Sequence, residues 1–215
     1  MDEAHAAAAS GAEAGTLVLS DAQVAGRGRS GKRWSSPPRG VWMTLIERPA
    51  DPSALDVLSL RIGLAAARAL DAFAAEPVRL KWPNDLYVDD AKLAGVLVEA
   101  RWRGDRLDWV AIGLGVNMAP PPDQTGAAVL EAGTSRTDVI CALLPELRAA
   151  AAMVGTLTPD EMDEYAARDL ARGRKCVEPL RGRVVGIAPS GELLVELADS
   201  VAHVRSGSLV LEVSE

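Results

Sequence analysis

The chain has 215 residues, 48% of them hydrophobic, and a formal net charge of −7. This composition is sufficient for a packed core, and the acidic balance disfavours binding to long nucleic acid through the overall charge. No apolar run approaches the roughly 20 residues that span a bilayer, and the Ala-rich start lacks the basic and apolar regions of a signal peptide, so we expect a cytoplasmic protein without membrane contact.

The first half of the chain predicts strands around one long helix. Residues 16–20 form a short apolar strand, and a Gly-rich polar stretch at 21–40 separates it from a second strand at 41–47. Asp51 and Pro52 are a good helix start, and apolar residues at helical spacing continue this helix to about residue 75. Further strands are predicted at 78–82, 86–88, 93–101 and 107–116, the last two joined as a hairpin.

The second half predicts two helices and then a change of period. A Pro-rich loop at 119–126 precedes helices at 136–154 and 159–171, and Pro145 predicts a kink or break in the first. After Gly173 the period becomes two, which predicts short strands at 177–180, 183–187, 193–197, 202–204 and 208–211. We therefore expect an α/β core over residues 1–173 and a small β-barrel or sandwich over 174–215.

Cysteine and histidine usage argues against several kinds of site. Cys141 and Cys176 are far apart and form no C-x-x-C pattern, so they predict two buried free thiols rather than a zinc site or a disulfide. The only histidines are His5 and His203. A histidine-based metal site or a Ser-His-Asp triad is therefore not expected.

The segment from Gly26 to Trp34 is the first candidate site. Its first eight residues contain four basic side chains and three glycines. Glycines let a ligand approach the backbone, arginine forks bind carboxylate and phosphate oxygens, and Trp34 offers an aromatic face. The segment suits a polyanionic small molecule with a planar part, and a flexible solvated loop is the alternative. It is not a Walker loop, because the Gly-Lys-Ser/Thr ending is absent.

Two further segments carry candidate ligand contacts. The run Lys81-Trp82-Pro83-Asn84-Asp85, with Lys92 beyond a turn, offers an amide, a carboxylate and two ammonium groups. An apolar strand then contains Gly113 and Gly115, which indicate close approach of a ligand or of another strand. Taken singly, the first is equally well read as a charged surface turn, and the second as a strand packed under a helix.

Together these segments resemble the biotin protein ligases, or biotin–acetyl-CoA-carboxylase ligases. The resemblance rests on Gln23-x-x-Gly-Arg-Gly-Arg-x-Gly-x-x-Trp34, Lys81-Trp-Pro-Asn-Asp85 with Lys92-x-x-Gly95, and Gly113-x-Gly-x-Asn117, in this order. It implies an α+β fold: a mixed sheet with flanking helices, like class II synthetases and lipoate ligases, and a C-terminal SH3-like barrel. It also implies the short form of the family, without an N-terminal DNA-binding domain.

The family chemistry has two steps and would involve ATP and Mg²⁺. Biotin and ATP give biotinyl-5′-AMP, and biotin then passes to a lysine of a biotin carboxyl carrier protein. The resemblance assigns catalysis to Lys92, Arg29 and Asp85, with Asp85 also the candidate metal ligand. Biotin contacts are implied for Gln23, Gly26, Arg27, Gly28, Arg29, Lys92 and Gly95, and ATP contacts for Arg29, Trp34, Lys81, Asn84 and Asn117.

One departure and two alternatives remain open. The family carries a Ser-Thr pair that contacts biotin just before the first helix, and this sequence begins at Met1-Asp2-Glu3, about where that pair would have ended. Either the start is truncated or biotin is held differently, and we expect weaker biotin binding than in a longer relative. A lipoate or octanoate ligase of the same fold and a biotin-binding protein without turnover are the alternatives. A homodimer is also compatible with the family, whereas a DNA-binding role is disfavoured.

Overall fold

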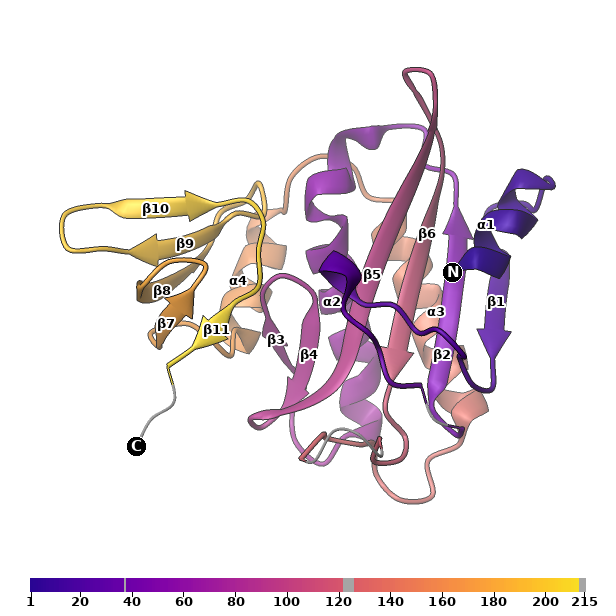
Figure 1. The fold of residues 1–215 in the computed structure, drawn as a ribbon, viewed down its shortest axis with the longest axis horizontal. Coiled ribbons are helices and arrows are strands. Elements are labelled where there is room, and N and C mark those ends of the chain that lie inside the picture. Colours follow the sequence, from indigo (N-terminus) through magenta and orange to yellow (C-terminus); the bar gives the residue numbers. More distant parts are fainter. Residues whose placement is uncertain (37, 122–125, 213–215) are drawn as a thin grey trace.

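The structure is a computed structural model that describes residues 1–36, 38–121 and 126–212. Its main sheet has six strands in the order β1-β2-β6-β5-β4-β3, and neighbouring strands pair antiparallel (Figure 1). The strands are β1 (Leu17–Ser20), β2 (Val41–Glu47), β3 (Arg79–Lys81), β4 (Asp85–Val88), β5 (Ala91–Arg103) and β6 (Arg106–Val116). One isolated parallel bridge joins Leu80 to Asp169, the residue that follows α4.

Helices cover one face of this sheet. Helices α2 (Leu55–Leu70) and α3 (Arg136–Ala151) lie behind it in Figure 1, and α4 (Pro159–Arg168) leads toward the C-terminal strands. Short 3-10 turns at Pro52–Ala54 and Asp71–Phe73 flank α2, so the predicted helix is one α-helix with a tight turn at each end. Asp51 caps the first turn by accepting a hydrogen bond from the Ser53 amide at 2.8 Å.

The opposite face carries an N-terminal helix for which the sequence analysis proposed no structure. Helix α1 (Asp2–Ala9) buries Ala4 and Ala8 against Ile46 of β2. Arg48 donates to the carbonyl oxygen of Ala8 at 2.8 Å, which satisfies one of the free acceptors at the helix end. The apolar stripe consists of alanines, which favour helix but are a weak signal of burial.

Of the kink or break expected at Pro145, the break is absent, and one of the two cysteines expected to be buried is exposed. The helix runs through Pro145 without a break. Pro145 is exposed, so the hydrogen bond that proline cannot make lies on the solvent side, where water can satisfy the carbonyl of Cys141. Cys141 is itself exposed, while Cys176 is buried, so only one of the two predicted buried thiols is buried.

The predicted C-terminal strands form a second antiparallel sheet, the SH3-like unit, in the order β10-β9-β8-β7-β11. They are β7 (Lys175–Glu178), β8 (Gly182–Ile187), β9 (Leu193–Glu196), β10 (Val201–Val204) and β11 (Val210–Leu211). Ile187 and Leu193 belong to the same apolar core as α2, and the Trp82 indole donates to the carbonyl of Gly191 at 3.0 Å. The second sheet is therefore packed firmly against the first.

Two other expectations concern loops and membrane contact. Part of the predicted Pro-rich loop, residues 122–125, lies outside the described residues. Within the described ranges, no helix combines the length and apolarity needed to cross a bilayer.

A buried ion pair joins α2 to the start of α4. Arg61, whose side chain is 1% exposed, donates to both carboxylate oxygens of Glu161, at 2.6 and 3.0 Å. The same carboxylate accepts from the Thr158 amide at 2.8 Å and so completes a capping box. Burial raises the pKa of Glu161, but the hydrogen bonds from Arg61 and Thr158 outweigh it, and the net pKa is lowered.

Replacing Glu161→Ala is expected to destabilise the fold by about 3–5 kcal/mol, because it leaves the buried Arg61 charge with carbonyl acceptors but no carboxylate. Asp160→Ala, an exposed position in the same first turn, is the control and is expected to lose less than about 1 kcal/mol. Urea unfolding at neutral pH measures both.

The wild-type contribution of Glu161 also has a defined pH dependence. Because the pKa is lowered in the folded state, the stabilisation is present above the unfolded value of about 4.3 and is lost as pH falls through the folded pKa. The difference between wild type and the Ala variant should therefore shrink on acidification. A difference that is independent of pH would contradict the ion-pair explanation.

Candidate active site

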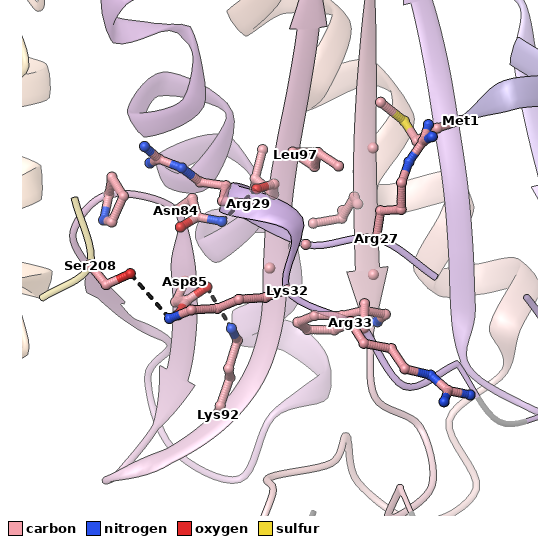
Figure 2. A pocket seen from close by; sticks show the side chains of 18 of the residues that line it. Met1, Arg27, Arg29, Lys32, Arg33, Asn84, Asp85, Lys92, Leu97 and Ser208 are labelled. Carbon is pink, nitrogen blue, oxygen red and sulfur yellow. Dashed lines mark hydrogen bonds and ion pairs between the residues drawn. The ribbon is translucent and has the colours of Figure 1, made fainter. Parts of the chain in front are cut away.

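A cavity of about 360 Å³ lies on the face of the main sheet opposite α2 and α3. The loop between β1 and β2 covers it, strands β2, β5 and β6 form its base, and the turn before β4 and residues 207–210 close one side (Figure 2). Four segments that are distant in sequence thus meet at one place.

The basic loop, residues 26–34, is a tight hairpin. Arg27 and Arg33 form an antiparallel bridge, and the Trp34 amide donates to the Gly26 carbonyl at 2.9 Å. A side chain on Gly26 would place its Cβ 2.3 Å from the Trp34 carbonyl oxygen, so this position accepts only glycine. Gly26 does not line the cavity, and its visible function is to close the loop.

Trp34 returns from this loop onto the sheet. Gly95 of β5 and Gly115 of β6 are directly paired, and a Cβ on either would lie within 3.0 Å of the Trp34 ring. The two glycines therefore form a flat seat for the indole. The sequence analysis linked these glycines to ligand approach, but their immediate neighbour in the structure is a side chain of the protein itself.

Opposite charges meet beside this indole. The Lys92 ammonium lies 2.6 Å from a carboxylate oxygen of Asp85 and 4.9 Å from the centre of the Trp34 ring (Figure 2). Strand β5 carries Lys92 and β4 carries Asp85. The predicted catalytic pair is thus brought together across two neighbouring strands, with each group held by the other.

The cavity is strongly cationic. Its described lining has two carboxylates, Asp2 and Asp85, and six cationic side chains: Arg27, Arg29, Lys32, Arg33, Lys81 and Lys92. Burial lowers the pKa of Arg29, which Asp85 partly offsets. The pKa of Lys81 is also lowered, first by burial and then by the nearby charges of Lys92, Arg174 and Lys32, against the attraction of Asp85. An anion entering here would relieve this repulsion.

The remaining predicted contacts divide into two groups. The first group, Gln23, Gly28 and Asn84, lines the cavity. The side-chain carbonyl of Gln23 accepts a hydrogen bond from the Ser36 hydroxyl at 2.7 Å, and the side-chain amide of Asn84 donates to the Val96 backbone carbonyl at 2.7 Å. Asn117 is buried outside the lining and donates to the Lys92 carbonyl at 3.2 Å. Its observed contact therefore supports the backbone of Lys92.

The structure adds lining residues that the sequence analysis did not name. Trp42 and Thr44 face the cavity from β2, and Lys32 donates to the Ser208 hydroxyl at 3.2 Å. The alternation along β2 could have shown that these two side chains share a face, but not that the basic loop covers that face. Ser208 could not have been found, because nothing local in the sequence places the second sheet here.

A metal site made by the protein alone is not found. Among the described residues, no group of three or more His, Cys, Asp or Glu side chains could hold an ion. Asp85 is a single carboxylate and is already paired with Lys92.

Comparison with known proteins gives a consistent family. Residues 6–117 match the model of the "Biotin/lipoate A/B protein ligase family". The "Bifunctional ligase/repressor BirA" of Bacillus subtilis is 31% identical, with 97% of this chain and 70% of that protein covered. The "Biotin--[acetyl-CoA-carboxylase] ligase" of Mycobacterium tuberculosis is also 31% identical, with 95% and 82% covered.

Solved structures agree on the fold. The biotin protein ligase from Aquifex aeolicus, solved in complex with biotin and ATP, superposes with a TM-score of 0.80. The match covers 98% of this chain and 94% of that one at 24% identity. The similarity extends over both sheets and therefore includes the segments that enclose the cavity.

The lowered pKa of Lys81 predicts that its amine is more reactive than that of an ordinary lysine. Competitive labelling with acetic anhydride, followed by mass spectrometry across pH, should give Lys81 a midpoint below the ordinary value of about 10.4. Asp85→Asn should lower this midpoint further, because it removes an attractive charge. Exposed Lys175 serves as the reference. A Lys81 midpoint at or above the ordinary value would contradict the burial of this amine among other cations.

Proposed function

Because the chain belongs to the biotin/lipoate A/B protein ligase family, we propose that it is an ATP-dependent biotin ligase. It forms biotinyl-5′-AMP and then transfers biotin to a lysine of a biotin carboxyl carrier protein. Relatives at 31% identity named as biotin ligases favour biotin over lipoate or octanoate. The carrier domain of a biotin-dependent carboxylase is the proposed protein partner. A cytoplasmic location and a homodimer remain predictions.

The observation that carries this proposal is the pairing of a cationic region with an apolar region in one cavity. The cationic groups include Lys92 and Arg29, while Trp42 and Leu97 contribute apolar side chains to the same cavity. A substrate with an apolar body and a terminal carboxylate matches both regions. The triphosphate of the second substrate, ATP, brings a further anion to the cations. The repulsion between the two anions is what the cations must offset.

In the first step, a carboxylate oxygen of biotin attacks the α-phosphorus of ATP. A new oxygen–phosphorus bond forms, the bond from the α-phosphorus to the bridging oxygen breaks, and pyrophosphate leaves with the electron pair. Lys92 and Arg29 stabilise the negative charge on the phosphoryl oxygens. The Lys92 ammonium now lies 2.6 Å from an Asp85 carboxylate oxygen. To contact the ligand, it must either leave Asp85 or bind both groups at once.

In the second step, the neutral amine of a carrier lysine attacks the acyl carbon of biotinyl-5′-AMP. An amide bond forms, the bond between the acyl carbon and the phosphate oxygen breaks, and AMP leaves. Asp85, freed from Lys92, orients the incoming amine and accepts its proton. The basic loop excludes water from the reactive anhydride until the carrier arrives.

The other assigned residues complete the proposed site. Gln23, Arg27, Gly28 and Gly95 contribute to the biotin side, and Trp34, Lys81 and Asn84 to the nucleotide side, with Gly26 and Asn117 supporting the loop and the Lys92 backbone. Asp85 is the carboxylate that would hold Mg²⁺, which would offset negative charge on the phosphates, because one or two carboxylates are the usual protein share for this ion. We assign residues 1–173 to the catalytic domain and 174–215 to a β domain that contributes one wall.

Replacing Lys92→Ala is expected to reduce biotin-dependent exchange of labelled pyrophosphate into ATP by about 10²–10³-fold, because one charged donor to the phosphoryl oxygens is lost. Lys175→Ala, at an exposed position in the second sheet, is the matched control and should keep wild-type exchange. Thermal unfolding of both variants reports whether the fold is intact. A folded Lys92 variant with unchanged exchange would overturn the assigned role.

The choice of acyl group is tested separately. Biotin is expected to raise the melting temperature, and lipoate and octanoate are not, because a ligand that binds only the folded state stabilises it. A shift with lipoate alone would transfer the proposal to the lipoate branch of the family.

A further inference from the structure

Glu99 is a carboxylate of β5 that lies beyond the cavity and contacts two different elements. It follows Gly95 and Leu97 on the same face of the strand, the face covered by the basic loop. One of its oxygens lies 2.7 Å from the His5 ring of α1, and the other lies 3.7 Å from the Arg27 guanidinium of the loop. Its side chain is 24% exposed, so these interactions are only partly screened by water.

His5 holds this carboxylate in a defined orientation. The Trp109 indole of β6 can only donate, and it lies 3.0 Å from Nδ1 of His5, so Nδ1 accepts. The proton of the neutral ring is therefore on Nε2, which donates to Glu99. Because His5 is 12% exposed and bonded at both nitrogens, it fixes Glu99 from the side away from the loop.

The Arg27 side chain points away from Lys92 and Asp85 (Figure 2). Its guanidinium donates to Asp2 of α1 at 2.7 Å in addition to its approach to Glu99. Figure 2 shows its side chain extending toward Met1, whereas Arg29 leaves the loop in a different direction and Lys32 reaches toward Ser208. Neighbouring cations of one short loop thus have different partners.

We infer that Glu99 is a positioning residue for the basic loop. Oriented by His5 and Trp109, it works with Asp2 to hold Arg27 against α1, and this tether sets the direction in which Arg29 and Lys32 enter the cavity. The inference deepens the proposed function and rests on it for its meaning in catalysis. Arg27 then anchors the loop in addition to its place on the biotin side of the cavity.

A tether of this kind has a clear physical benefit. The loop carries four cations within eight residues, and their mutual repulsion favours open conformations when no anion is bound. A carboxylate at the base of the loop neutralises one of them without occupying the cavity. The loop is then partly ordered before the ligand binds, so less conformational entropy is lost on binding.

Loop order can be measured without any activity assay. The basic residues of the loop are themselves trypsin sites, and cleavage rates in a folded protein follow local opening. Glu99→Gln keeps an acceptor for His5 but removes one of the two charges that attract Arg27, the other being Asp2. Cleavage after Arg29, Lys32 or Arg33 in the ligand-free variant should be about two- to fivefold faster, the change that a partly exposed ion pair supports.

A double-mutant cycle tests whether Glu99 acts through Arg27. Arg27→Gln alone should accelerate cleavage at the three remaining sites at least as much, because it removes the ion pairs to both Asp2 and Glu99, and adding Glu99→Gln should then have no further effect. Arg101→Gln is the matched control, since Arg101 also approaches Glu99, at 3.5 Å, but does not belong to the loop. Unchanged cleavage in Glu99→Gln, additive effects of Glu99→Gln and Arg27→Gln, or acceleration by Arg101→Gln would each overturn the inference.

An activity measurement separates this inference from the proposed function. In pyrophosphate exchange, Glu99→Gln should raise KM for biotin or ATP by the same two- to fivefold and leave kcat within about twofold, as expected when binding alone is weakened. A fall in kcat with unchanged KM would overturn the positioning role. Absence of exchange in the wild type would defeat the proposed function, while the proteolysis result would still decide how the loop is held.

Discussion

Repulsion among like charges in the cavity is the constraint on which much of this structure depends. An acidic protein gathers six cationic side chains around one cavity, and without a ligand each of them needs a counterweight. Asp85 holds Lys92, Asp2 and Glu99 hold Arg27, and Ser208 accepts from Lys32. These partners come from α1, from strands β4 and β5, and from the segment between β10 and β11, so several parts of the fold offset the charge of the site while its lining stays cationic.

The seat of Trp34 connects this electrostatic arrangement to the backbone. Its indole lies against the paired glycines of β5 and β6, which brings the end of the basic loop down onto the sheet next to Lys92. A larger residue at Gly95 or Gly115 would lift the ring and separate the loop from the strand that carries Lys92. Glycine is therefore required here for the close approach of a protein side chain.

The second sheet contributes more than a terminal appendage would. Its core residues belong to the same apolar cluster as α2, and Trp82, which directly precedes the Pro83-Asn84-Asp85 turn, donates to the carbonyl of Gly191. The turn that leads to Asp85 is consequently held by the second sheet through Trp82 and by β5 through the hydrogen bond from Asn84 to the Val96 carbonyl. This packing also brings Ser208 to the side of the cavity, where it meets Lys32 of the basic loop.

The sequence by itself determined the elements and the kinds of chemistry available. Periodicity located the strands and α2, and the basic loop, the Lys81–Asp85 run and Lys92 indicated an anion site, because these signals are local and depend on residue type and spacing. Only the tertiary structure decided which groups meet: that Asp85 holds Lys92, that Gly95 and Gly115 seat Trp34, that Asn117 supports the backbone outside the cavity, and that Glu99 faces Arg27. The physical reason is that hydrogen bonds and ion pairs act over a few ångströms, and these partners are separated along the chain by distances that only strand register and packing bring together.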